Sequence, residues 1–209
     1  MLVRRAFLFV PLLAITPAPA FANDLEIELD KLITYFKAAA TMTGATAVGV
    51  ASLRPAKFRR AERPKVAAQI NDFHTQLTEL SIAQGVMLGD MGDYIESVRA
   101  RGFSEAEHPQ MWRGIVSQMQ EISGKVRIVF EAQQDAPWLN VALSTEDRDA
   151  LSYVLLARGA LLSQLRALPA PRTPIEIDKL AALHARYLDL AKQLFELRNA
   201  LSAAKQRFA

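Results

Sequence analysis

The sequence contains no cysteine and only three histidines. Without cysteine the chain has no disulfide, no thiolate for a metal, no thiol nucleophile, no attachment site for c-type haem and no cysteine for lipid attachment. His74, His108 and His184 form neither a His-x-x-x-His nor a His-Glu-x-x-His pair, the spacings that place two zinc ligands on one helix face. We therefore interpret each histidine as a surface or partly packed side chain.

Motifs for catalysis and phosphate binding are missing as well. No Gly-x-Ser-x-Gly sequence is present, and Gly85, Gly89 and Gly92 lack the spacing and the preceding strand of a phosphate-binding loop. Asp90, Asp93 and Glu96 follow a helical period, not the alternation of a calcium loop, which favours a solvated acidic helix face. We expect neither an enzyme nor a cofactor; a site assembled only in three dimensions is the remaining enzymatic alternative.

Methionine supplies one alternative set of ligands. Met87 and Met91 lie one helical turn apart, and Met111 and Met119 follow. Thioethers bind copper, and a Met–His pair holds haem in some helical bundles. Methionine also fills irregular gaps between helices, and no Met-x-x-Met cluster occurs. The sequence favours core methionines, and a metal- or haem-binding bundle is the second functional hypothesis.

The first 22 residues have the pattern of a cleavable secretory signal. Arg4 and Arg5 precede a ten-residue apolar run, Ala6 to Ile15, which is short against the roughly 20 residues that span a bilayer. Small residues at Ala20 and Ala22 suit signal peptidase. We expect cleavage after Ala22, export to a bacterial periplasm, and a single domain over residues 23–209.

The remaining chain is almost neutral. Arg4 and Arg5 account for two of the three net positive charges, which leaves a net charge of +1 after residue 22. Bulk charge therefore gives no argument for a nucleic acid as partner.

Helical periodicity dominates the rest of the chain. Apolar residues recur at helical spacing over residues 24–40, 64–85 with a possible continuation to 98, 104–134 and 144–168. Residues 38–53 are uncharged and rich in small side chains, so they fit either a helix or a loop. Ser104 and Glu107 form a capping-box pattern, and Thr173, Pro174 and Glu176 form a stronger one. The sequence predicts an all-α, up-and-down bundle of about five or six helices.

The C-terminal helix carries the most regular pattern. Leucines and other apolar residues alternate at spacings of three and four from Leu180 to Phe208, which is a heptad repeat. The repeat packs either inside the bundle or against a second chain, and the bundle is favoured because the other helices need a surface to cover.

Two features indicate interaction surfaces. Residues 54–65 carry six basic side chains against one acid, between two prolines, and Trp138 lies in a proline-containing loop. Basic clusters bind anionic surfaces such as lipid headgroups or acidic proteins, and an exposed tryptophan anchors interfaces. The alternatives are a solvated connector and a tryptophan folded into the bundle end. The candidate surface comprises Arg54, Lys57, Phe58, Arg59, Arg60, Arg63 and Trp138.

Long amphipathic helices without ligand sets favour an exported bundle that acts by binding another protein of the cell envelope, as an adaptor, accessory subunit, inhibitor or chaperone-like factor. Peripheral contact with an anionic surface is the second kind of partner that the sequence suggests.

Overall fold

The computed structural model describes residues 23–134, 136–150 and 164–208, and over these residues the chain is helical without any β-strand. The predicted all-α class is confirmed for this part of the chain. The predicted signal peptide lies outside the described residues, as does the middle of the expected helix 144–168. The elements are α1 (Asn23–Ala51), the 3-10 turn η1 (Pro55–Lys57), α2 (Arg63–Arg101), α3 (His108–Gln134), α4 (Leu139–Ala142) and α6 (Pro174–Phe208).

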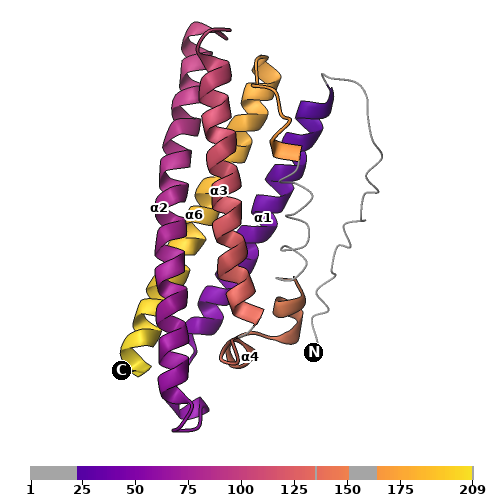
Figure 1. The fold of residues 1–209 in the computed structure, drawn as a ribbon. Helices are drawn as coiled ribbons and strands as arrows, with labels where there is room; N and C mark the ends of the chain where they lie inside the picture. The colour runs from indigo at the N-terminus through magenta and orange to yellow at the C-terminus, as the bar shows by residue number, and fades with distance from the viewer. Residues whose placement is uncertain (1–22, 135, 151–163, 209) are drawn as a thin grey trace.

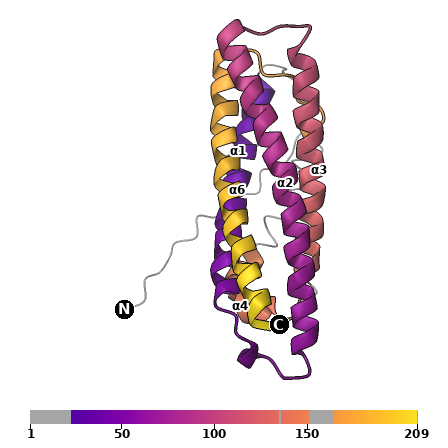
Figure 2. The same ribbon diagram turned by 90° about the vertical axis from the view of Figure 1, so that its left-hand side faces the viewer.

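The long helices form an elongated bundle in which α6 lies between α1 and α2, and α3 packs on the other side of α2 (Figures 1 and 2). Successive helices α1, α2 and α3 alternate in direction, as predicted for an up-and-down bundle. Lys179 on α6 contacts Asp30 near the start of α1, at 2.8 Å, and Arg207 reaches the Ala51 carbonyl at its end. These contacts show that α6 runs parallel to α1.

The heptad positions of α6 form the centre of this bundle. Phe36 of α1 packs against Tyr187 with ring centroids 3.7 Å apart and ring planes tilted by 39°, and the leucines pack around them. Because these side chains are buried within one chain, the repeat serves the intramolecular core that the sequence favoured. The buried heptad residues are Leu180, Leu183, Tyr187, Leu190, Leu194, Leu197, Leu201 and Ala204.

The two stretches that the sequence left open are both helical. Residues 38–51 continue α1, and Gly49 allows α4 to approach, because a Cβ at this position would lie 2.3 Å from the Ala142 carbonyl oxygen. The small residues of this stretch therefore permit close packing. Helix α2 continues without a break through Gly85, Gly89 and Gly92 to Arg101.

The capping box predicted at Thr173 is confirmed, whereas at Ser104 the predicted capping partner is wrong. At Thr173 the hydroxyl accepts from the Glu176 amide, and the Glu176 carboxylate accepts from the Thr173 amide at 2.8 Å. At the start of α3, the buried ring of His108 replaces Glu107 as capping partner, because its Nδ1 accepts from the Ser104 amide at 2.6 Å. His108 is thus a structural residue, not the surface or partly packed histidine that we expected.

Candidate interaction surfaces

The predicted basic stretch forms one end of the bundle, together with the end of α6. The α1–α2 connection and the C-terminus lie at the same end in both ribbon views (Figures 1 and 2). Phe58 in the connection meets Phe208 of α6 edge-on, with ring centroids 5.6 Å apart. We call this region, with its basic side chains from residues 54–65 and 205–207, the basic end.

The predicted basic residues divide into two groups. Arg54 and Arg63 are partly structural: the Arg54 guanidinium donates to the Ala51 carbonyl at 3.0 Å, and Arg63 donates to the Phe58 carbonyl at 3.4 Å. Lys57, Arg59 and Arg60 are exposed, and their side chains make no hydrogen bond or ion pair with described residues. This second group is free to bind a partner.

The two aromatic candidates do not belong to the surface. Trp138 is only 1% exposed and packs edge-to-face on Phe73 of α2, so its prediction as an exposed anchor is wrong. Phe58 is 8% exposed and turns inward onto Phe208. Large aromatic side chains gain more from the apolar bundle end than from water, which explains both positions.

Further basic residues join this end from elsewhere in the chain. Lys205 and Arg207 come from the last turns of α6. Lys65, the last residue of the predicted stretch, lies in the first turn of α2. Arg207 donates to the Val50 carbonyl, and its partial burial, followed by the charge of Arg54, lowers its pKa. These α6 cations are about 150 residues away from the connection in sequence. They reach it only because α6 packs parallel to α1, so the sequence analysis could not place them there.

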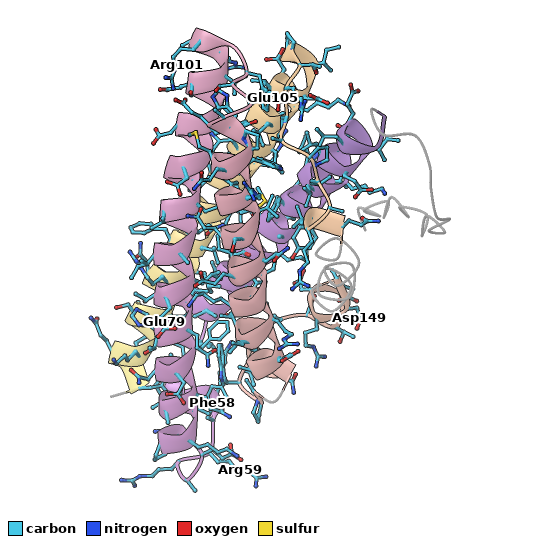
Figure 3. The ribbon with its side chains drawn as sticks, turned by 45° about the horizontal axis from the view of Figure 1, so that its top comes forward. Phe58, Arg59, Glu79, Arg101, Glu105 and Asp149 are labelled. Atoms are coloured by element: carbon cyan, nitrogen blue, oxygen red, sulfur yellow. The ribbon has the colours of Figure 1, made fainter. Side chains whose placement is uncertain are left out.

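The opposite end of the bundle has arginines too, but acids neutralise them. Arg99 contacts Asp178 at 2.7 Å, Arg172 contacts Glu105 at 2.8 Å, and Arg101 lies 3.6 Å from Glu107. Figure 3 labels Arg101 and Glu105 at this end, and Phe58 and Arg59 at the basic end. By contrast, no carboxylate in the described part of the chain forms an ion pair with a basic-end side chain.

A second surface, which the sequence analysis did not single out, runs along the solvent side of α2. Its residues are spaced by three or four positions, so they form one stripe on the helix. Ile82 and Val86, 64% and 56% exposed, occupy its middle. Beside them, a Cβ on Gly85 or Gly89 would meet nothing within 4 Å. We call the exposed residues Asp72, Thr75, Glu79, Ile82, Val86, Asp90 and Asp93 the outer stripe of α2.

The outer stripe is acidic as well as apolar. Asp90 accepts a hydrogen bond from Gln118 at 2.7 Å, while Asp72, Glu79 and Asp93 make no ion pair with the described residues. From Val66 to Val98 the helix contains no lysine or arginine. The acidic face predicted around Asp90 and Asp93 is thus part of a longer surface with an apolar middle.

One small cavity lies among the described helices. A cavity of about 20 Å³, close to the volume needed for one water, lies among apolar side chains that include Phe36, Leu80 and Leu194. Met87, Met91 and Met119 are buried in the core, as predicted. Among the described residues no group of three histidine or acidic side chains is arranged to hold a metal ion. In the same part of the chain, none of the helices combines the length and the hydropathy of a membrane span.

Ser202 and Lys205 have the Ser-x-x-Lys spacing of some serine enzymes, a match that the sequence analysis missed. Such enzymes need the serine hydroxyl within hydrogen-bond reach of its base. Ser202 is half-buried, Lys205 is exposed, and the structure has no hydrogen bond between them. The spacing therefore gives no support to a nucleophilic site in this part of α6.

Comparison with known proteins gives no match: no family model, no curated protein and no solved structure is similar to this chain.

Proposed function

We propose that this chain is an exported, non-enzymatic helical bundle that binds another protein of the bacterial cell envelope through the outer stripe of α2. The observation that carries the proposal is the pair of exposed aliphatic side chains, Ile82 and Val86, beside two glycines with open space above them. Glycine in a helix interior costs about 1 kcal/mol relative to alanine. Since no neighbour in the fold requires Gly85 or Gly89, a closely approaching partner gives them a role.

The partner that fits this surface is an amphipathic helix with basic flanks. Small residues allow a helix backbone to approach closely, and Ile82 and Val86 supply the apolar contact at the centre of the stripe. Carboxylates lie at both ends of the stripe, at Asp72 and Glu79 on one side and at Asp90 and Asp93 on the other. Lysine or arginine on the partner helix would complement these charges and fix its position.

The proposal is tested by placing a photo-crosslinking amino acid at position 86 of the exported protein and, as control, at position 128. Ile128 on α3 is 53% exposed, which matches Val86. We expect an adduct with one defined protein from position 86 and none from position 128. Adducts of equal yield from both positions, or from neither, contradict the proposal.

Binding of the purified partner then gives the quantitative test. The double change Ile82→Gln and Val86→Gln removes the apolar middle and should weaken binding at least tenfold, because central apolar residues carry most of an interface's free energy. The change Ile128→Gln should leave the affinity unchanged. If both variants bind with the affinity of the unmodified chain, the outer stripe of α2 is not the interface.

A further inference from the structure

We propose that the basic end binds the headgroups of an anionic phospholipid surface, so that this end of the bundle faces the lipid. The inference rests on charge that the fold gathers but does not neutralise. Two segments far apart in sequence, residues 54–65 and 205–207, bring their cations together at this end (Figures 1 and 2). The basic side chains are Arg54, Lys57, Arg59, Arg60, Arg63, Lys65, Lys205 and Arg207, and the only acid in residues 54–65 is Glu62.

Part of this charge is already used within the fold. Arg54, Arg63 and Arg207 donate to backbone carbonyls at the end of α1 and in the connection to α2. The remaining cations, Lys57, Arg59, Arg60, Lys65 and Lys205, have no side-chain hydrogen bond or ion pair with any described residue. Five free cations at the end of an elongated bundle form a site for multiple anionic groups.

The connection at the basic end exposes no large apolar side chain, which favours headgroups over an acidic protein. Protein interfaces have an apolar centre, to which aromatic residues contribute most. At the basic end both large apolar side chains of the connection, Leu53 and Phe58, are buried. A polybasic cluster binds anionic lipid through charge alone and needs no apolar centre. The chemistry of this end therefore matches a layer of phosphate groups.

The charge of α2 sets the orientation. The body of this helix carries Asp72, Glu79, Asp90, Asp93 and Glu96, with no lysine or arginine between Val66 and Val98. An anionic surface repels these carboxylates and attracts the basic end. The face of α2 is therefore kept away from the surface, and the outer stripe of α2 stays accessible. This inference is independent of the protein partner proposed above.

The test uses purified residues 23–209 and vesicles of phosphatidylcholine, with and without phosphatidylglycerol. We expect the protein to sediment with vesicles that contain phosphatidylglycerol and not with vesicles of phosphatidylcholine only. The bound protein should dissociate as the salt concentration is raised, because surface charges are screened within about 10 Å at 0.1 M. Replacing Lys57, Arg59 and Arg60 with Gln should weaken binding about a hundredfold, since each cation near an anionic surface contributes about fivefold.

A matched control removes the same charge from the opposite end. Replacing Arg99, Arg101 and Arg172 with Gln also lowers the net charge by three, and should leave vesicle binding within about twofold. Circular dichroism melts of both triple variants verify that they fold. Equal losses in the two variants would mean that net charge, not the basic end, determines binding, and would overturn the inference.

Two further measurements separate this inference from its alternatives. Inorganic phosphate at millimolar concentration should not displace the protein from vesicles; displacement would identify free phosphate as the ligand and overturn the headgroup assignment. The variant Ile82→Gln with Val86→Gln should keep its full vesicle binding, which distinguishes a failure of the protein-binding proposal from a failure of this one. No sedimentation with phosphatidylglycerol vesicles at low salt would also overturn the inference.

Discussion

His74 lies half-buried on α2, close to the positive charges at the end of α6. Burial lowers its pKa from the ordinary value of 6.5, and the charges of Lys205 and Arg198 lower it further. The folded state thus favours the neutral ring, whereas the unfolded chain takes up a proton near pH 6.5. Protonation stabilises the unfolded state relative to the folded one, so stability falls as pH drops through this value.

We predict that His74→Gln reduces this loss of stability on acidification. Urea unfolding at pH 7.5 and pH 5.5 should show a smaller decrease in the free energy of unfolding for the variant than for the unmodified chain. The variant His184→Gln serves as control for the other half-buried histidine. An unchanged pH dependence in His74→Gln would show that this histidine is not protonated more readily on unfolding.

His108 illustrates what is difficult to infer at the level of one residue. Its Nδ1 accepts from the Ser104 amide, so the ring proton is on Nε2, which lies 2.9 Å from the Ser97 hydroxyl. Tyr94 and Phe103 flank the ring. The sequence contains a normal capping-box pattern at Ser104 and Glu107. Nothing in this pattern indicates that His108, and not Glu107, accepts the hydrogen bond from the Ser104 amide. That choice depends on the space between α2 and α3.

At the scale of the elements, two glycines in long helices have opposite roles. Gly49 on α1 faces the Ala142 carbonyl, and a Cβ there would lie 2.3 Å from this backbone oxygen. Gly89 on α2 faces open space. We predict that Gly49→Ala destabilises the fold by about 1–3 kcal/mol through overpacking, whereas Gly89→Ala stabilises it by about 1 kcal/mol.

Thermal and urea unfolding of the two variants test this pair directly. Because the chemical change is the same, the difference reports the surroundings alone. Similar effects of both substitutions on the free energy of unfolding would mean that α4 does not dock against α1 at Gly49.

The heptad positions of α6 should dominate stability. Leu190 and Leu194 are buried against the other helices, so each Leu→Ala change should cost about 2–5 kcal/mol, from lost transfer free energy and the cavity left behind. A domain is stable by only about 5–15 kcal/mol, so the double variant should be close to unfolded. The exposed Lys192 should tolerate alanine within about 0.5 kcal/mol.

Circular dichroism melts, run beside sedimentation analysis, provide the measurement. Loss of structure in the double variant is expected from an intramolecular core. If the variant instead stays folded and changes only its oligomeric state, the heptad positions serve a second chain.

For the whole molecule, export remains a prediction from the first 22 residues. If the signal is cleaved after Ala22, intact-mass measurement of the protein from the periplasmic fraction should give Asn23 as the amino terminus. Changing Ala20 and Ala22 to Leu should block cleavage, because signal peptidase requires small residues at these positions. A periplasmic protein that retains Met1 would contradict the prediction.

The sequence by itself determined the helical class and the directions of α1, α2 and α3, because helical periodicity and short connections act locally along the chain. It also determined the capping box at Thr173 and the burial of the heptad residues of α6. The pattern specifies which face of each helix is apolar, and water drives that face inward whatever its neighbour is.

Only the tertiary structure decided which surfaces the molecule presents. The sequence indicated six basic residues in one stretch, but Lys205 and Arg207 join them because α6 packs parallel to α1. Trp138 lies in a loop by sequence, yet Phe73 of a distant helix covers it. Likewise, Gly49 and Gly89 look equivalent in the sequence, and only their neighbours separate them. Pairwise contacts between remote segments depend on packing geometry, which local patterns do not encode.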